Sequence, residues 1–226
     1  MNGNTLSEAI KEKALFLGAS LAGIASLDAV LQSPSHGDGS KFHRRFQHGS
    51  FIVMALAHPE NSPSLDWWDG RGGTPGNREL RGTSKRLQHW LKVDCGIASR
   101  IIPYQVERGG IFLKEAAVMA GMGIIGKNNL LITPRYGAGV RLRALFLEKR
   151  LPSDKPSEFT PCDACPAPCQ EACPQHAFQG GTYDRNMCIR QMLQDETNRK
   201  RLDLGRGVRS VTAYCRACEW ACPVSV

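Results

Sequence analysis

The sequence predicts an α+β fold made of two domains, residues 1–150 and 151–226. In the first domain, segments with a helical hydrophobic pattern alternate with short strand-like apolar runs. Residues 151–161 contain three prolines and are predicted to be a linker. Eight of the nine cysteines lie in the last 65 residues, so the second domain has a composition of its own.

Capping residues and hydrophobic patterning place the elements of the first domain. Thr5 and Glu8 have the spacing of a capping box, which predicts a helix from Thr5 to about Leu17 that Gly18 ends. Residues 134–139 are predicted to turn a hairpin between the strands on either side. Along the chain we expect strands at 21–26 and 51–57 around a loop at 32–50, an irregular stretch at 58–77, a helix at 78–94 capped by Asn77, a strand at 98–102, a helix at 112–120, and strands at 130–133 and 140–147.

The cysteines of the second domain form two close-spaced runs, and each run ends in Cys-Pro. The first is Cys162-x2-Cys165-x3-Cys169-x3-Cys173, the second is Cys215-x2-Cys218-x3-Cys222, and Cys188 lies between them. Eight thiolates are the number that two 4Fe–4S clusters need. The repeated run predicts a ferredoxin-like two-cluster module, with short helices near Gln170, over 185–194 and over 208–217.

In bacterial two-cluster proteins, the last cysteine of each run ligates the cluster of the other run. That rule predicts two interlocked ligand sets. Cluster 1 takes Cys162, Cys165, Cys169 and Cys222, and cluster 2 takes Cys173, Cys188, Cys215 and Cys218. Residues 189–214 separate Cys188 from its companions and form an insertion relative to a simple ferredoxin.

Other uses of the cysteines are less consistent with the sequence. A disulfide framework is disfavoured because the chain is long and has no recognisable signal peptide. Two zinc sites are the stronger rival, since Cys-x2-Cys also suits tetrahedral zinc. The three-cysteine runs that end in Cys-Pro favour iron–sulfur clusters over zinc. The ninth cysteine, Cys95, is predicted to be a buried thiol.

Net charge and hydropathy limit the classes of binding partner and the cellular compartment that the sequence allows. The net charge is +8, and two clusters at roughly −2 each would lower it to about +4. Such mild basicity suits an anionic substrate, a phosphate-bearing cofactor, an acidic redox partner or RNA. No apolar run reaches the ~20 residues of a membrane helix. Arg44 and Arg45 precede the apolar run 51–57, as in a twin-arginine export signal. That run has the length of a buried strand, however. A cytoplasmic location without membrane contact is therefore predicted.

Three further features could bind ligands or a partner. Gly121, Gly123 and Gly126 match a dinucleotide fingerprint, but they follow a predicted helix instead of a strand. The turn could still present backbone amides and the Lys127 cation to an anion, or it could simply end the helix. The pair Trp67-Trp68 either stacks on a planar ligand or anchors its loop. The basic run Arg199 to Arg201, with Arg206 and Arg209, forms either a solvated helix face or a docking surface for an acidic electron donor.

Residues 113–117, 121–132 and 134–137, together with the cysteine runs, resemble the epoxyqueuosine reductase family, a relative of the reductive dehalogenases. The resemblance implies a nitroreductase-like domain that binds cobalamin, followed by the double-cluster domain. Electrons would come from a donor such as ferredoxin or flavodoxin and serve a reductive reaction. A flavin in the same domain is the weaker alternative. The implied cofactor-binding residues are Gly123, Gly126, Lys127, Asn128, Arg135 and Tyr136.

The chain departs from the family pattern in two places. Glu107 stands where the family has an aspartate as presumed proton donor, so the resemblance implies Glu107 as the catalytic acid, and the alternative is an exposed surface carboxylate. The sequence ends four residues after Cys222, without the helical-repeat extension of the family, which makes a tRNA substrate unlikely. A rival hypothesis follows: an electron-transfer protein that serves a partner, for example a corrinoid protein, and has no substrate of its own.

Overall fold

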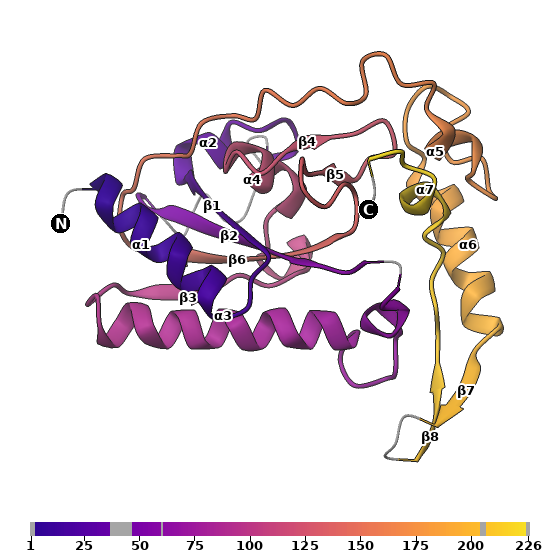
Figure 1. The fold of residues 1–226 in the computed structure, drawn as a ribbon, viewed down its shortest axis with the longest axis horizontal. Coiled ribbons are helices and arrows are strands. Elements are labelled where there is room, and N and C mark those ends of the chain that lie inside the picture. The colour runs from indigo at the N-terminus through magenta and orange to yellow at the C-terminus, as the bar shows by residue number, and fades with distance from the viewer. Residues whose placement is uncertain (1–2, 37–46, 60, 204–206, 225–226) are drawn as a thin grey trace. The chain divides into compact units, whose positions relative to one another are not determined.

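The computed structural model confirms a mixed α+β chain (Figure 1). It describes residues 3–36, 47–59, 61–203 and 207–224. Arg44, Arg45 and Arg206 lie outside the described residues. Two compact units share the chain: unit 1 is Met1–Ala57, Leu80–Ile124 and Arg141–Phe159, and unit 2 is His58–Glu79, Ile125–Val140 and Thr160–Val226. Both units are discontinuous in sequence, and the functional division at residue 150 stays a prediction.

Unit 1 is built on a four-stranded sheet. The order across the sheet is β1 (Leu21–Ser26), β2 (Ser50–Ala57), β6 (Val140–Leu147) and β3 (Ser99–Ile101). β1 runs antiparallel to β2, and β3 runs antiparallel to β6. All but the last residue of β2 is buried, as expected of a continuous apolar run in a central strand.

Helices α1 and α3 supply much of the core that packs on this sheet. Ile10 of α1 and the side chains of Leu80, Leu87 and Leu91 of α3 belong to one buried apolar cluster with Met54 of β2. Their spacing follows the helical repeat, which explains why both helices were recognisable from sequence. The α-helices before residue 120 are α1 (Gly3–Phe16), α2 (Leu27–Leu31), α3 (Pro75–Val93) and α4 (Leu113–Met119). Short 3-10 helices lie at Pro34–His36 and Val106–Arg108 in unit 1 and at Pro63–Asp66 in unit 2.

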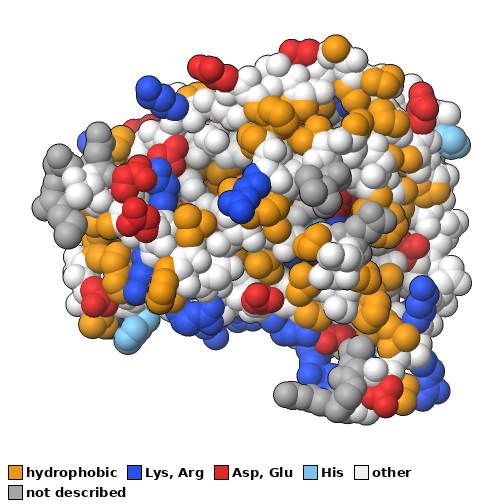
Figure 2. All heavy atoms as spheres, in the orientation of Figure 1, with side chains coloured by type: hydrophobic (Ala, Val, Ile, Leu, Met, Phe, Trp, Pro, Cys, Tyr) orange, Lys and Arg blue, Asp and Glu red, His pale blue; other side chains and the backbone are white. Residues whose placement is uncertain are grey.

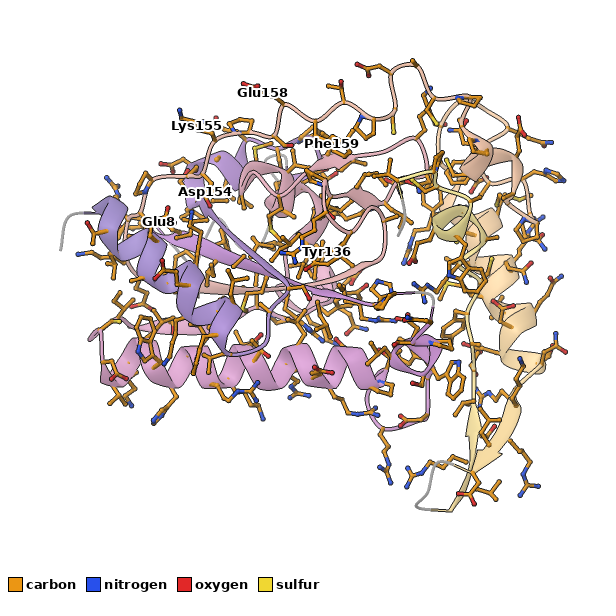
Figure 3. All side chains as sticks on the ribbon, in the orientation of Figure 1. Glu8, Tyr136, Asp154, Lys155, Glu158 and Phe159 are labelled. Atoms are coloured by element: carbon orange, nitrogen blue, oxygen red, sulfur yellow. The ribbon has the colours of Figure 1, made fainter. Side chains whose placement is uncertain are left out.

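The predicted linker is partly packed against unit 1. The carboxylate of Asp154 accepts hydrogen bonds from the Ile24 amide and the Lys11 ammonium, both at 2.8 Å. Lys11 also pairs with Glu8 at 2.9 Å, and Figure 3 shows Glu8 and Asp154 on neighbouring elements. The segment after β6 therefore returns along β1 and is held there by polar contacts.

Two predicted helix starts are wrong, and the backbone shows why. α1 begins at Gly3, so Thr5 lies inside the helix and does not cap it. α3 begins at Pro75, because proline is tolerated in the first helical turn. The hydroxyl of Thr74 accepts from the Asn77 amide at 3.2 Å, so Thr74 takes the capping role predicted for Asn77.

The predicted hairpin over 130–147 is also wrong. β5 (Leu131–Ile132) pairs with β4 (Ile124–Ile125), while β6 lies between β2 and β3 in the large sheet. Thr133 closes a tight turn with Gly137 through two backbone hydrogen bonds of 2.8 and 3.0 Å. The apolar end of β6, residues 144–147, is fully buried, and a two-stranded hairpin offers no such burial.

Unit 2 contains short elements. α6 begins where the Asp184 carboxylate accepts from the Asn186 and Met187 amides. The helix predicted over 208–217 is wrong, since β8 occupies its first half and pairs with β7. The unit's regular elements after residue 160 are α5 (Pro168–Glu171), α6 (Arg185–Thr197), β7 (Lys200–Asp203), β8 (Val208–Val211) and α7 (Ala217–Trp220). Within the described ranges, no helix is long and apolar enough to cross a bilayer.

Candidate functional site

Four cysteines predicted as one ligand set surround a single pocket of unit 2. Lys127 and Asn128 complete much of its lining. Cys169 and Cys222 are buried, and the other two are half-buried. Burial, followed by the charges of the neighbouring cysteines, raises the pKa of the Cys169 thiol. The pocket is lined by Cys162, Cys165, Cys169, Cys222, Lys127, Asn128 and a few apolar residues.

The other four cysteines are also close enough to influence one another. Burial, followed by the charges of Cys215, Cys188 and Cys173, raises the pKa of the Cys218 thiol to about 12. Burial is also the first cause of the raised pKa of Cys215, although that thiol is the exposed one of the eight. Coordination to a metal centre would deprotonate these thiols outright.

Backbone amides are aimed at several of these sulfurs. The amide of Ala167 donates to Cys165 Sγ at 3.4 Å, and the amide of Ala177 donates to Cys173 Sγ at 3.3 Å. Ala167 has φ 61° and His176 has φ 52°, the left-handed region that costs a non-glycine residue on the order of 1–2 kcal/mol. The strained backbone orients the amides toward sulfur, an arrangement that tunes an iron–sulfur cluster.

The turn Gly126-Lys127-Asn128, here called the GKN turn, bonds to both cysteine sets. The Lys127 ammonium donates to the Cys165 carbonyl at 2.9 Å, and the Asn128 amide donates to the Cys218 carbonyl at 3.1 Å. Asn128 is buried and also accepts from the Leu130 amide at 3.1 Å. A Cβ on Gly126 would lie 2.6 Å from Ile132, so only glycine fits this close turn. The turn therefore anchors the cysteine loops, a role that sequence reasoning missed.

The remaining predicted residues are distributed over both units. Glu107 is exposed on its 3-10 helix in unit 1, and Gly123 is buried in the same unit. In unit 2, Arg135 is exposed and its guanidinium lies over the Tyr136 ring, 5.2 Å from the centroid. Cofactor binding and catalysis by these residues stay predictions.

A buried charged network behind the second cysteine set was missed entirely. His58 Nδ1 lies 2.7 Å from Asp66 Oδ2, and the guanidinium of Arg216 pairs with both Asp66 and Glu219. Arg216 also donates to the His58 carbonyl at 3.2 Å. Burial opposes charge on Arg216, but its hydrogen bonds and its attraction to Glu219 and Asp66 outweigh this and raise its pKa.

Arg216 lies between Cys215 and Cys218, and Glu219 follows Cys218 directly. The network therefore fixes the loop of the second cysteine set to the segment 58–66. Charged residues inside a close-spaced cysteine run were the sequence signal that could have revealed it. Within the described residues, His58 Nε2 is buried without a hydrogen-bond partner.

Predictions about the tryptophan pair and Cys95 can now be placed. Trp68 exchanges backbone hydrogen bonds of 2.9 Å with Thr212, and its ring lies 5.7 Å from that of Tyr214, which supports the anchoring interpretation of the tryptophan pair. His176 is exposed. Cys95 is half-buried beside the core of unit 1, and burial is the first cause of its raised pKa.

The thiol lining of the pocket suits a soft metal centre. In the described part of the chain, no three His, Cys, Asp or Glu side chains form a group that could hold one metal ion. Four thiols instead surround the pocket, and soft thiolate sets select zinc, copper(I) or iron–sulfur clusters. A cubane cluster is larger than one ion and spreads its four thiolates further apart, so these residues fit a 4Fe–4S cluster.

Comparison with known proteins identifies relatives of the chain, although no protein-family model matches it. The epoxyqueuosine reductase of Bacillus cereus is 29% identical over 191 residues, which cover 77% of this chain and 47% of that protein. The chain thus spans about half the length of this curated relative.

Solved structures share the fold at low identity. An epoxyqueuosine reductase crystallised with a tRNA stem loop has a TM-score of 0.69 and 22% identity, covering 99% of this chain and 66% of that one. A catabolic reductive dehalogenase in complex with 3-bromo-4-hydroxybenzoic acid has a TM-score of 0.69 and 18% identity, covering 97% of this chain and 32% of that one. A reductive dehalogenase structure described as bearing on B12-dependent dehalogenation matches at TM-score 0.54 and 18% identity over 75% of this chain and 25% of that one. The predicted resemblance to epoxyqueuosine reductases is confirmed, and with the reductive dehalogenases the chain shares the fold.

Proposed function

We propose, from the premise that this chain is an epoxyqueuosine reductase-like protein, that it is an iron–sulfur oxidoreductase with two 4Fe–4S clusters. The observation that carries the proposal is the arrangement of eight cysteines as two four-thiol sets in one compact unit. Cys162, Cys165, Cys169 and Cys222 would hold one cluster, and Cys173, Cys188, Cys215 and Cys218 the other. The clusters would supply one-electron transfer in a ferredoxin-like module.

The cysteine loops prepare this site in three ways. Amides of Ala167 and Ala177 donate to sulfur and stabilise negative charge there. The GKN turn holds the loops of Cys165 and Cys218 through side-chain hydrogen bonds. The Arg216 network fixes the segment between Cys215 and Cys218. These contacts restrict the thiols before any metal binds, which lowers the entropic cost of binding.

Cobalamin in a nitroreductase-like domain is the second part of the proposal. The shared fold with a reductive dehalogenase described in terms of B12 supports it, and a flavin is the weaker alternative. Gly123, Gly126, Lys127, Asn128, Arg135 and Tyr136 are the proposed contacts. Glu107 is exposed, so its carboxylate can exchange protons with solvent and serve as the proposed acid.

A pure electron carrier is the second candidate, and one observation favours it. The side chains of Lys127 and Asn128 hydrogen-bond the cysteine loops, so their polar groups already have partners other than a cofactor. In this case the chain would accept electrons from a ferredoxin or flavodoxin and pass them to a partner such as a corrinoid protein. A cytoplasmic location belongs to both proposals.

The tRNA question also needs a direct test. The expectation against tRNA rested on where the sequence ends. An epoxyqueuosine reductase of the same fold was crystallised with a tRNA stem loop, so epoxyqueuosine-modified tRNA is a candidate substrate. Conversion of this tRNA by the reduced, cobalamin-loaded protein would establish the activity. Absence of turnover with intact clusters and bound cobalamin would exclude this substrate.

Anaerobic purification tests the metal content and the cofactor. We expect iron and sulfide near eight per chain, since two cubane clusters contain about eight of each. Iron of about four or less, or stoichiometric zinc, would contradict the two-cluster proposal. Titration with cobalamin, followed by the visible spectrum and by binding heat, separates the two candidates. Binding supports the reductase, and no binding favours the electron carrier.

A further inference from the structure

The helix α6 has an unusual environment in unit 2. None of its 13 residues is buried. Isolated helices of this length are marginal in water, so α6 depends on its Asp184 cap and on contacts from one side. Those contacts come from Asp195, which accepts from the Cys215 amide at 2.7 Å, and from Gln191 and Gln194, both 3.1 Å from Gln175. On the opposite face, Glu196 accepts from the Tyr214 hydroxyl at 2.6 Å, and Met192 and Leu193 are exposed.

The outer face of α6 and the hairpin β7–β8 together form a surface that we call the arm, residues 185–203 and 207–211. Figure 1 shows α6 leading directly into the hairpin. Leu193 is 57% exposed, Met192 is 37% exposed and Val208 is 59% exposed. Figure 2 shows Lys and Arg side chains with hydrophobic ones near them in the region of the hairpin.

The arm carries six basic and three acidic side chains, Asp195, Glu196 and Asp203, so its net charge is +3. Arg190 is exposed on the same helix face as Leu193, and Asp203 is the only acidic side chain in the two strands. Apolar residues within a charged rim are typical of a protein interface, whereas RNA sites use phosphate contacts and aromatic stacking. The basic residues of the arm are Arg185, Arg190, Arg199, Lys200, Arg201 and Arg209.

The arm is also part of the second cysteine set. Cys188 is a residue of α6 itself, and Cys215 follows β8 by four positions and is exposed. The Asp195–Cys215 contact joins the two segments. A protein bound to the outer face of α6 would thus lie about one helix diameter, roughly 10 Å, from Cys188.

We propose that the arm is the docking surface for an acidic electron-donor protein of the ferredoxin or flavodoxin class, and that electrons enter through cluster 2. This inference rests on the proposed function. In each transfer, the reduced centre of the donor loses one electron and cluster 2 gains it, with no bond formed or broken. Positive charge on the arm steers the acidic donor, and Leu193, Met192 and Val208 form the apolar centre of the contact.

The test uses the reconstituted protein and a chemically reduced acidic two-cluster ferredoxin in anaerobic stopped-flow absorbance. Two variants reverse charge on the arm, Arg190→Glu and Arg201→Glu, and a third, Leu193→Asp, breaks its apolar centre. Arg150→Glu is the matched control, because Arg150 is an exposed arginine of unit 1. At low salt we expect each charge reversal to slow electron transfer by at least about tenfold, with high salt removing the difference. The control should behave as wild type.

Reduction by dithionite and the iron content separate this proposal from the proposed function. Both should be unchanged in all four variants, because a small reductant needs no docking surface. Loss of iron in wild-type protein would instead overturn the two-cluster proposal itself. Equal ferredoxin rates in the arm variants and the control would refute the docking site. Two other outcomes would also refute the docking site. In the first, the arm variants abolish binding of a tRNA stem loop but leave the ferredoxin rate intact. In the second, they abolish self-association, measured by sedimentation, and again leave the ferredoxin rate intact.

Discussion

Unit 1 and the cysteine-rich part of unit 2 are stabilised by different means. Unit 1 has a buried apolar cluster of aliphatic side chains from α1, α3 and the sheet. In unit 2 the buried apolar residues after position 160 are few and mostly small, such as Ala167, Ala177 and Val211. Its loops are held by N–H···S contacts, the GKN turn and the Arg216 network. Burial of apolar side chains can therefore stabilise unit 1, whereas we infer that unit 2 depends on its proposed clusters.

Removal of one proposed cluster should show most clearly that unit 1 and unit 2 differ in what stabilises them. We expect Cys188→Ser to reduce iron from about eight to about four per chain and to expose the arm to proteolysis, while unit 1 stays folded. Hydrogen exchange by mass spectrometry would locate the loss. Cys95→Ser is the matched control and should retain all the iron. Full iron in the Cys188 variant would contradict the ligand assignment.

Breaking the charged network is the next strongest test of unit 2. Arg216→Met leaves Asp66 and Glu219 buried without their cation, which typically costs about 3–5 kcal/mol. We expect the loss of stability to be confined to unit 2. It would be measured as faster cluster release under denaturant and as faster amide hydrogen exchange in segment 58–66. The control Arg190→Met removes an exposed arginine and should have little effect. Similar behaviour of the two variants would show that the network does not hold the loop.

Leu87→Ala should weaken unit 1 without touching the metal centres. Leu87 is fully buried in the core cluster, so the cavity should cost about 2–5 kcal/mol of unfolding free energy. Leu15→Ala, at a half-exposed position of α1, should cost far less. Denaturation followed by far-UV circular dichroism measures the difference, and iron content should remain at the wild-type value. If iron were lost in the same transition in which unit 1 unfolds, the two units would not unfold independently.

A smaller effect is expected from pH on unit 1. Burial lowers the pKa of His36 below the ordinary histidine value of 6.5, and His36 Nε2 accepts from the Phe112 amide at 3.1 Å. The unfolded chain therefore binds the proton more readily than the folded one. Stability from neutral His36 is present above pH 6.5 and is lost as pH falls below it. Denaturant midpoints between pH 5 and 8 would measure this slope, which His36→Asn should flatten.

Patterning predicted much of unit 1 because its segments bury one continuous apolar face. The run 51–57 was recognisable as a central strand, and Leu80, Leu87 and Leu91 marked α3 by their helical spacing. The hairpin at 134–139 failed because local turn residues do not reveal strand partners. Burial of the β6 side chains between β2 and β3 outweighs local pairing.

The sequence by itself predicted the iron–sulfur chemistry proposed for this protein, since seven cysteines in two Cys-Pro runs, with Cys188 between them, supply the eight thiolates that two clusters need. It also determined the relationship to the epoxyqueuosine reductases through residues 121–132. Only the tertiary structure decided that the GKN turn holds the cysteine loops and that Arg216 joins them to His58 and Asp66. The physical reason is that ligand spacing is local, whereas these hydrogen bonds join residues up to 158 positions apart and exist only once the chain has folded.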